Sequence, residues 1–234
     1  MEKVFPSFDE AVSDVFDGAV VMVSGFGGTG GTPQNLLSAL RNQGARDLTV
    51  VSNTAGLASL LGFGTLPGQT AIDVGTLIDN DQVRKVIASY PVSPSPSKIN
   101  SFESYFRKGK IELELVPQGT LVERIRAGGA GIPAFFTPTG VGTQLSEGKE
   151  VREFEGRQYI LEHALKSDFA LVKGHKADTL GNLTYRGTSQ NFGAVMVRST
   201  GVSIVEVDQV VNVGEIDPHL IHTPALFVDR LVTL

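Results

Sequence analysis

Hydrophobic positions along the 234-residue chain fall into short apolar runs that are separated by glycine- and proline-rich turns. Residues 19–23 are continuously apolar, which is the pattern of a strand buried on both faces of a sheet. Residues 111–116 (IELELV) instead alternate apolar and acidic side chains with a period of two, which also predicts a strand. Further strands are predicted at residues 48–51, 82–89, 169–173 and 202–207.

Helical patterns stand between several of these strands, at residues 9–16, 34–40 and 102–107. Thr32 is the expected N-cap of the second helix, with Pro33 at its first position. Thr120 and Glu123 form a T-x-x-E capping box, so a helix is expected to start at Thr120 and to end among Gly128, Gly129 and Gly131. The alternation predicts an α/β fold, an open and mostly parallel sheet with helices on both faces, in a single domain of residues 1–234.

Composition narrows the class of protein. A net charge of −5 with 19% charged residues argues against a nucleic-acid binder and against a polybasic membrane surface. The absence of cysteine excludes a disulfide framework, a thiolate metal site and a cysteine nucleophile. The first residues, MEKVFPSFDEAV, lack a basic n-region and a long apolar h-region, so a cytoplasmic protein is expected.

A glycine-rich loop follows the first strand and precedes a helix, an arrangement that lets backbone N–H groups meet an anion. Its residues 25–30 satisfy the G-x-G-x-x-G pattern, which raises the possibility of a dinucleotide site. Such a site needs an acidic residue at the carboxyl end of the second strand, to bind the ribose. That strand ends in Ser52 and Asn53, and the nearby Asp47 lies at its start, so the dinucleotide interpretation is disfavoured.

Two amide side chains follow predicted strands at the end where open α/β sheets bind ligands. Asn53 comes after the second strand, and Gln118 lies between the strand at residues 111–116 and the helix after it. Taken alone, Asn53 is most simply an Asx-turn residue, and Gln118 is a solvated amide in a tight turn.

Other catalytic patterns are weak or missing. His219 and His222 are three residues apart, but neighbouring prolines favour an extended loop and no further zinc ligands stand nearby in sequence. There is no G-x-S-x-G elbow, and GTQLSEGKE has the wrong spacing for a P-loop. Lys173 and Lys176 would either steer an anionic substrate or be ordinary surface lysines. The charged stretch that follows Thr143 predicts a solvated hairpin around Gly156.

Residues 117–143, PQGTLVERIRAGGAGIPAFFTPTGVGT, closely resemble the signature region of the family I coenzyme A transferases of the 3-oxoacid group, and in particular of their A (alpha) subunits. SNTAG at residue 52, KADTLGNLTYRGTSQNFG at residue 176 and VGEIDPHLIHTPALFVDR at residue 213 are similar to further motifs of that family. The chain departs from the family pattern at Ser24, at one extra residue before Pro33, and over residues 56–79.

The resemblance implies a site. Gln118 would donate its amide to an oxyanion or carboxylate, Asn53 would orient the acid, and the glycine loop would contact coenzyme A, which is a substrate and not a bound cofactor. The loop residues concerned are Ser24, Gly25, Phe26, Gly27, Gly28, Thr29 and Gly30.

The family's nucleophile is a glutamate in a Glu-Asn-Gly motif of the B (beta) subunit, and this chain contains no Glu-Asn-Gly. The resemblance therefore implies half of an enzyme, active only when it is joined by a B subunit in an α2β2 assembly. The alternative is a non-catalytic acyl-CoA- or nucleotide-binding module of the same fold.

Overall fold

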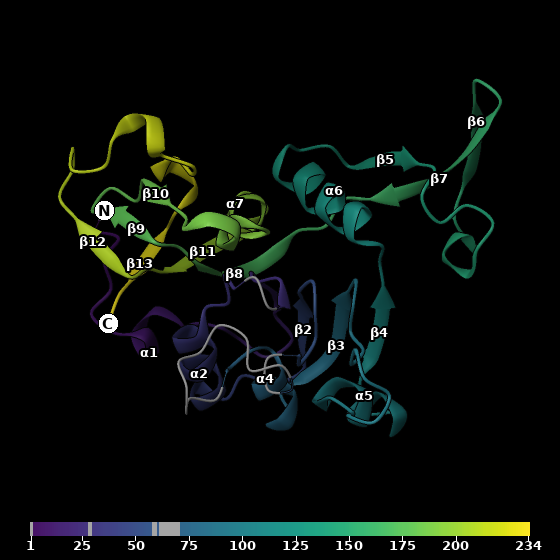
Figure 1. Ribbon diagram of the computed structural model, residues 1–234, viewed down its shortest axis with the longest axis horizontal. Coiled ribbons are helices and arrows are strands. Elements are labelled where there is room, and N and C mark those ends of the chain that lie inside the picture. Colours follow the sequence, from purple (N-terminus) through teal and green to yellow (C-terminus); the bar gives the residue numbers. More distant parts are fainter. Residues whose placement is uncertain (1, 28–29, 58–59, 61–70) are drawn as a thin grey trace.

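A computed structural model describes residues 2–27, 30–57, 60 and 71–234 (Figure 1). Its centre is a sheet of seven strands in the order β13–β11–β8–β1–β2–β3–β4, and every neighbouring pair is parallel. The predicted open parallel sheet is therefore confirmed. The strands are β1 (Val20–Val23), β2 (Leu48–Val51), β3 (Val83–Ala88), β4 (Glu112–Leu115), β8 (Ser167–Lys173), β11 (Thr200–Glu206) and β13 (Arg230–Val232).

Helices cover both faces of this sheet, as expected (Figure 1). One face packs against α1 (Phe8–Ala11), α2 (Gln34–Gln43), α4 (Gly75–Asp79) and α5 (Ser101–Arg107), and the other against α6 (Gln118–Gly129) and α7 (Gly193–Met196). Successive strand residues alternate between the two cores, because side chains of a strand point to opposite faces. No helix in the described part of the chain is both long enough and apolar enough to span a membrane.

Two small sheets accompany the large one. The first joins β10 (Leu183–Thr184), β9 (Lys176–Asp178) and β12 (Gln209–Val211). The second joins β5 (Ala134–Thr137), β7 (Arg157–His163) and β6 (Val151–Phe154), and it extends away from the main body (Figure 1). We call this second sheet the arm. Its β6–β7 pair is the hairpin predicted around Gly156, and Glu155 and Gly156 turn with φ of 51° and 76°.

The first helix is shorter than predicted, ending at Ala11 and not at residue 16. A longer helix would use the Ala11 carbonyl to accept from the Val15 N–H, but that carbonyl accepts from the Arg230 guanidinium at 2.8 Å. The Val15 N–H bonds to the Val12 carbonyl instead, at 3.1 Å. A tertiary contact thus ends the helix early. Half of the segment at residues 56–79 that departs from the family pattern, residues 58–59 and 61–70, lies outside the described residues, and α4 is the final part of the segment.

Candidate functional site

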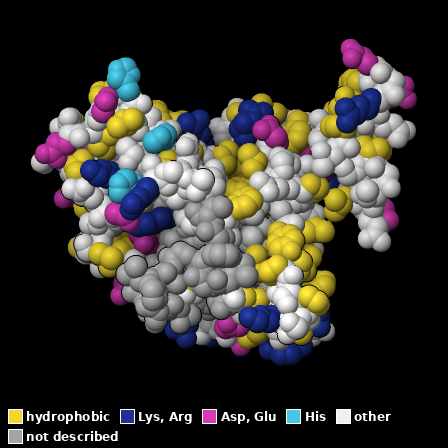
Figure 2. All heavy atoms as spheres, viewed as in Figure 1, with side chains coloured by type: hydrophobic (Ala, Val, Ile, Leu, Met, Phe, Trp, Pro, Cys, Tyr) yellow, Lys and Arg dark blue, Asp and Glu magenta, His cyan; other side chains and the backbone are white. Residues whose placement is uncertain are grey.

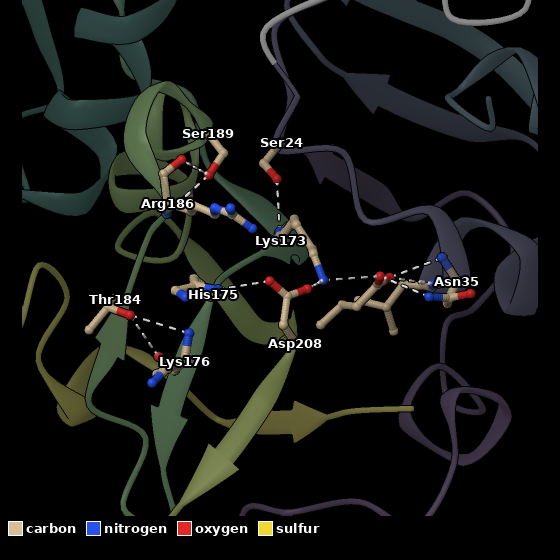
Figure 3. Close-up of polar contacts among 11 residues, drawn as sticks. Ser24, Asn35, Lys173, His175, Lys176, Thr184, Arg186, Ser189 and Asp208 are labelled. Atoms are coloured by element: carbon tan, nitrogen blue, oxygen red, sulfur yellow. Dashed lines mark hydrogen bonds and ion pairs between the residues drawn. The ribbon is translucent and has the colours of Figure 1, made fainter. Parts of the chain in front are cut away.

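The glycine loop begins directly after β1 and is tied to the neighbouring strand at its base. The Ser24 hydroxyl donates to the Gly31 carbonyl at 2.6 Å and accepts from the Lys173 backbone N–H at 3.1 Å. Ser24 is buried, and its two hydrogen bonds join the start of the loop to Gly31 at its other end and to the end of β8. Figure 3 shows Ser24 above Lys173, at the end of β8. Gly28 and Thr29 of the predicted loop lie outside the described residues.

Asn191 braces the same loop from the opposite side. Its Oδ1 accepts from the Gly25 N–H at 3.2 Å, and its Nδ2 donates to the Gly30 carbonyl at 3.1 Å. One amide therefore binds both ends of the loop. A Cβ at Gly31, where φ is +82°, would lie 2.6 Å from the Ser189 carbonyl oxygen, so this position requires glycine. Sequence reasoning gave Asn191 no role, although it stands in the segment that resembles the family's Asn-Phe motif.

The start of α2 is capped by a distant carboxylate. Pro33 occupies the N-cap position without a side-chain bond, so the expectation that Thr32 caps this helix is wrong. Glu206, at the end of β11, accepts from the backbone N–H groups of Asn35 and Leu36 at 2.9 and 3.2 Å, and from Asn35 Nδ2 at 2.9 Å. No local sequence signal identifies this cap, because the carboxylate comes from a strand far along the chain.

The Glu206 cap also bears on the dinucleotide interpretation. A pyrophosphate would bind where backbone N–H groups and the helix dipole are free to meet its charge. In α2 the first-turn N–H groups of Asn35 and Leu36 already bind the carboxylate of Glu206. The start of the helix is therefore occupied by the carboxylate of Glu206. This is a second argument against a dinucleotide site, besides the absence of a ribose-binding acid.

Lys173 belongs to a charged network beside the loop and not to an open surface. Its Nζ lies 2.6 Å from Asp208 Oδ1 and 3.6 Å from Glu206 Oε1, while Asp208 Oδ2 lies 2.8 Å from His175 Nδ1 (Figure 3). Partial burial opposes ionisation of Asp208, but hydrogen bonds from Lys173 and His175 outweigh it and lower the pKa of the carboxyl group. Lys176 lies in β9, where its backbone N–H bonds to Thr184 Oγ1 at 3.2 Å.

Asn53 continues the ladder between β2 and β3 past the end of β2. Its carbonyl accepts from the N–H groups of Ser89 and Tyr90 at 3.2 and 2.9 Å. The side chain is buried, and its Oδ1 makes no hydrogen bond within the described part of the chain. Asn53 is thus an inward-facing group, and its unpaired Oδ1 does not form the Asx turn that its sequence position alone suggested.

Gln118 is the first residue of α6, and its side chain is exposed. The helix starts here because Pro117 fixes the backbone at the N-cap, with φ of −53°. The predicted capping box is wrong: α6 has no side-chain cap, and the Thr120 hydroxyl is buried without a hydrogen-bond partner among the described residues. The helix ends at Gly129, as the run of glycines predicted.

The site residues lie along one edge of the sheet, at the carboxyl ends of its strands. Ser24 and Asn53 follow β1 and β2, which are neighbours, whereas Gln118 follows β4 and lies beyond β3. A cleft of about 650 Å³ opens between β4, α6 and the arm. In Figure 2, hydrophobic side chains gather on this face below the arm, and exposed apolar residues of this edge include Tyr90 and Leu115.

His219 and His222, the two histidines considered as metal ligands, have different structural environments. His222 Nδ1 accepts from the Tyr185 backbone N–H at 3.3 Å, and His219 lies in a short 3-10 helix at residues 218–220. Across residues 2–27, 30–57, 60 and 71–234, no three potential ligands among His, Cys, Asp and Glu gather at one place.

Comparison with known proteins identifies the family. The family model described as "Coenzyme A transferase" matches residues 5–234. The chain is 48% identical to the A subunit of the 3-oxoadipate CoA-transferase of Pseudomonas putida, covering 100% of this chain and 94% of that protein. It is 43% identical to the mitochondrial succinyl-CoA:3-ketoacid coenzyme A transferase 2A of Mus musculus, covering 95% of this chain but only 43% of that longer protein.

Solved structures agree on the fold. Glutaconate coenzyme A-transferase from Acidaminococcus fermentans superposes with a TM-score of 0.83 over 99% of this chain and 75% of that one, at 20% identity. The resemblance seen in the signature segments thus extends over nearly the whole chain, and this chain belongs to the coenzyme A transferase family.

Proposed function

We propose that this chain is the A subunit of a heteromeric transferase that moves coenzyme A between a 3-oxoacyl-CoA, such as acetoacetyl-CoA, and a carboxylic acid such as acetate or succinate. The observation that carries the proposal is the 48% identity to a 3-oxoacid-type A subunit over the full length of the chain. The order of polar groups along the carboxyl edge of the sheet supports it: the glycine loop, Asn53 and Gln118 follow β1, β2 and β4.

The chemistry requires a carboxylate nucleophile. A glutamate attacks the thioester carbonyl, the C–S bond breaks, and coenzyme A leaves as a thiolate while an acyl-glutamyl anhydride remains. The thiolate then attacks the glutamyl carbonyl and releases the first acid, which leaves a glutamyl-CoA thioester. The second acid reverses these steps and takes coenzyme A away.

We assign the glutamate to the B subunit, because this chain lacks the Glu-Asn-Gly motif. The mouse relative supports this division. That protein is named as a transferase and not as one of its subunits, and the present chain covers only 43% of its length. Exposed apolar side chains at the carboxyl ends of the strands, such as Tyr90 after β3 and Leu115 at the end of β4, are typical of a surface that a partner covers. An α2β2 assembly is the arrangement we expect.

The residues of this chain would bind and polarise the substrates. Each step passes through a tetrahedral oxyanion, and an amide donor placed at that oxygen stabilises it. Gln118, exposed at the start of α6, is the proposed donor, and buried Asn53 is proposed to orient the acid. The glycine loop, held by Ser24 and Asn191, would contact coenzyme A with backbone groups.

The test is to produce this chain alone, and together with the product of the neighbouring gene, and to measure transfer from acetoacetyl-CoA and succinyl-CoA to acetate and succinate. We expect a stable complex, with activity only when both chains are present. Borohydride, which reduces a thioester, should inactivate the complex only after incubation with acyl-CoA. A chain that binds coenzyme A but forms no active complex would favour the non-catalytic binding module. Full activity of the chain alone would refute the division of the site.

A further inference from the structure

A row of small polar side chains crosses the sheet just beyond its apolar core. Met22, Val51 and Ile87 lie side by side on β1, β2 and β3, and all three pack into the core beneath α6 and α7. Two residues further along each strand stand Ser24, Asn53 and Ser89. Because strand side chains alternate between faces, these three residues form the next row on the same α6-covered face.

Independent contacts support this orientation. The ladder continues past the strand ends, since the Ser52 N–H bonds to the Ile87 carbonyl and the Ser89 N–H to the Asn53 carbonyl. Ser52 and Thr54, the residues on either side of Asn53, line a small hollow at the base of the glycine loop with Val23, Ser24 and Val74, and Val23 and Val74 belong to the opposite core. Because successive side chains alternate between faces, Asn53 points away from Ser52 and Thr54, to the face that α6 covers.

Three buried oxygens along this edge lack hydrogen-bond partners within the described residues: Asn53 Oδ1, Ser89 Oγ and Thr120 Oγ1. Asn53 and Thr120 are 3% and 4% exposed. Asn53 and Ser89 are neighbours on adjacent strands, and Thr120 is in the first turn of α6, whose Leu121 and Ile125 pack onto the row below. Buried polar groups are normally paired, so unpaired oxygens on two adjacent strand ends and on the first turn of the helix that covers this face indicate a binding position.

The chemistry of the cluster suits a carboxylate. The hydroxyls of Ser89 and Thr120 can each donate one hydrogen bond, and a half-turn of the Asn53 amide presents its Nδ2 as a further donor. The amino terminus of α6, a helix of 12 residues without a side-chain cap, follows β4 at the same edge of the sheet and favours negative charge.

We propose that Ser89 and Thr120 bind the carboxylate of the acid substrate together with Asn53. This assignment rests on the proposed transferase function, and it extends the site from the amides to two hydroxyl groups. It makes the row beneath α6 the pocket for the acid, while the glycine loop next to it serves coenzyme A.

The fourth unpaired oxygen of this kind provides a matched control. Ser167 is 9% exposed, and its Oγ likewise lacks a partner among the described residues. It is the first residue of β8, so it lies at the opposite edge of the parallel sheet, roughly 20 Å from the carboxyl ends at about 3.3 Å per residue. Ser167→Ala removes a comparable buried hydroxyl far from the pocket.

The experiment uses the complex of both chains and compares Ser89→Ala, Thr120→Val and Ser167→Ala. For Ser89→Ala and Thr120→Val we expect the KM for the acid to rise about 10-fold or more, as for a lost hydrogen bond to a charged group, with a smaller change in the KM for acyl-CoA. The melting temperature should stay unchanged or rise, because an unpaired buried hydroxyl is removed. Thr120→Ser, which keeps the hydroxyl, should restore the KM for the acid.

The opposite pattern would overturn the proposal. In one such outcome, the three hydroxyl-removing variants change stability alike and leave the KM for the acid within about 2-fold of wild type. The unpaired oxygens then bind ordered water and have no role in substrate binding. Equal rises in both KM values would also refute a carboxylate pocket. Wild-type transfer activity is measured first, because its absence would refute the proposed function, whereas active wild type with unaffected variants refutes only this inference.

Discussion

Replacing Glu206 by glutamine tests whether a carboxylate from β11 holds α2, and with it the end of the glycine loop. The substitution keeps the shape of the side chain but removes its charge and one acceptor oxygen. Oε2 now accepts from two backbone N–H groups, and Oε1 accepts from Asn35 Nδ2. In the variant, a glutamine NH2 group would face the Asn35 NH2 group, donor against donor. Lys173 keeps its contact with Asp208 at 2.6 Å, so no cation is left unpaired.

The magnitude follows from these contacts. Hydrogen bonds to charged groups contribute about 1.5–3 kcal/mol each, and loss of an N-cap costs about 0.5–2 kcal/mol. One bond is lost and two are weakened, while the relieved desolvation of the buried carboxylate offsets part of the loss. We expect the free energy of unfolding to fall by about 2–4 kcal/mol. For a chain of this length that lowers the melting temperature by roughly 5–15 °C.

The assay is thermal unfolding of the purified chain and of its complex, followed by circular dichroism. Glu153→Gln makes the same chemical change at an exposed position of β6 and should leave the melting temperature unchanged. Asn35→Ala should cost less in the Glu206→Gln background than in the wild type, because both remove the same contact. A Glu206→Gln protein that melts within about 2 °C of wild type would refute the view that this cap stabilises α2.

Three further outcomes are expected from the same site. Gln118→Ala should lower kcat of the complex about 100-fold if Gln118 is the proposed oxyanion donor, with little change in melting temperature because the side chain is exposed; an unchanged kcat removes it from the mechanism. Asn191→Ala should raise the KM for acyl-CoA about 10-fold by releasing both ends of the glycine loop, with Asn191→Asp intermediate because it keeps the acceptor; equal KM values in all three proteins would contradict the brace. Asp208→Asn should destabilise the chain at neutral pH, because folding lowers the pKa of this carboxyl group and its ionised form therefore stabilises the folded state. The stabilisation is fully present above the unfolded pKa of about 3.9 and is lost as pH falls through the folded pKa. Melting curves of wild type and Asp208→Asn should therefore converge below about pH 4, and a constant difference down to pH 3 would contradict the sign.

Local patterns predicted the elements of the fold better than their ends. The alternation at residues 111–116 and the turn at Gly156 depend on neighbouring residues only, and both elements formed as predicted. The first helix was predicted too long because Arg230, at the other end of the chain, binds the Ala11 carbonyl. The capping box at Thr120 failed because Pro117 starts the helix earlier. The order of the strands in the sheet depends on contacts between segments far apart in sequence, so it could not be predicted from the periodicity of each segment.

The site divides in the same way. Asn53, Gln118 and the glycine loop could be found from the sequence because each directly follows a predictable strand. Glu206 and Asn191 could not be assigned their roles, since they act on the loop and helix from more than 150 residues away along the chain. The unpaired state of the Ser89 hydroxyl is a property of packing, and it appears only when the strands are assembled.

The strand order also sets the course of folding during synthesis. β1 pairs with β2, which follows it closely, but its other edge pairs with β8, which is made much later, and the sheet is completed only when β13 joins β11 near the last residue. Forming such distant parallel pairs is slow, because loop closure must precede the contacts that stabilise it. Until β8 emerges, the apolar edge of β1 is open to pairing with other chains. The yield of folded protein should therefore depend more on the time between synthesis of β1 and synthesis of β8, during which this edge of β1 is unpaired, than on the stability of the finished sheet.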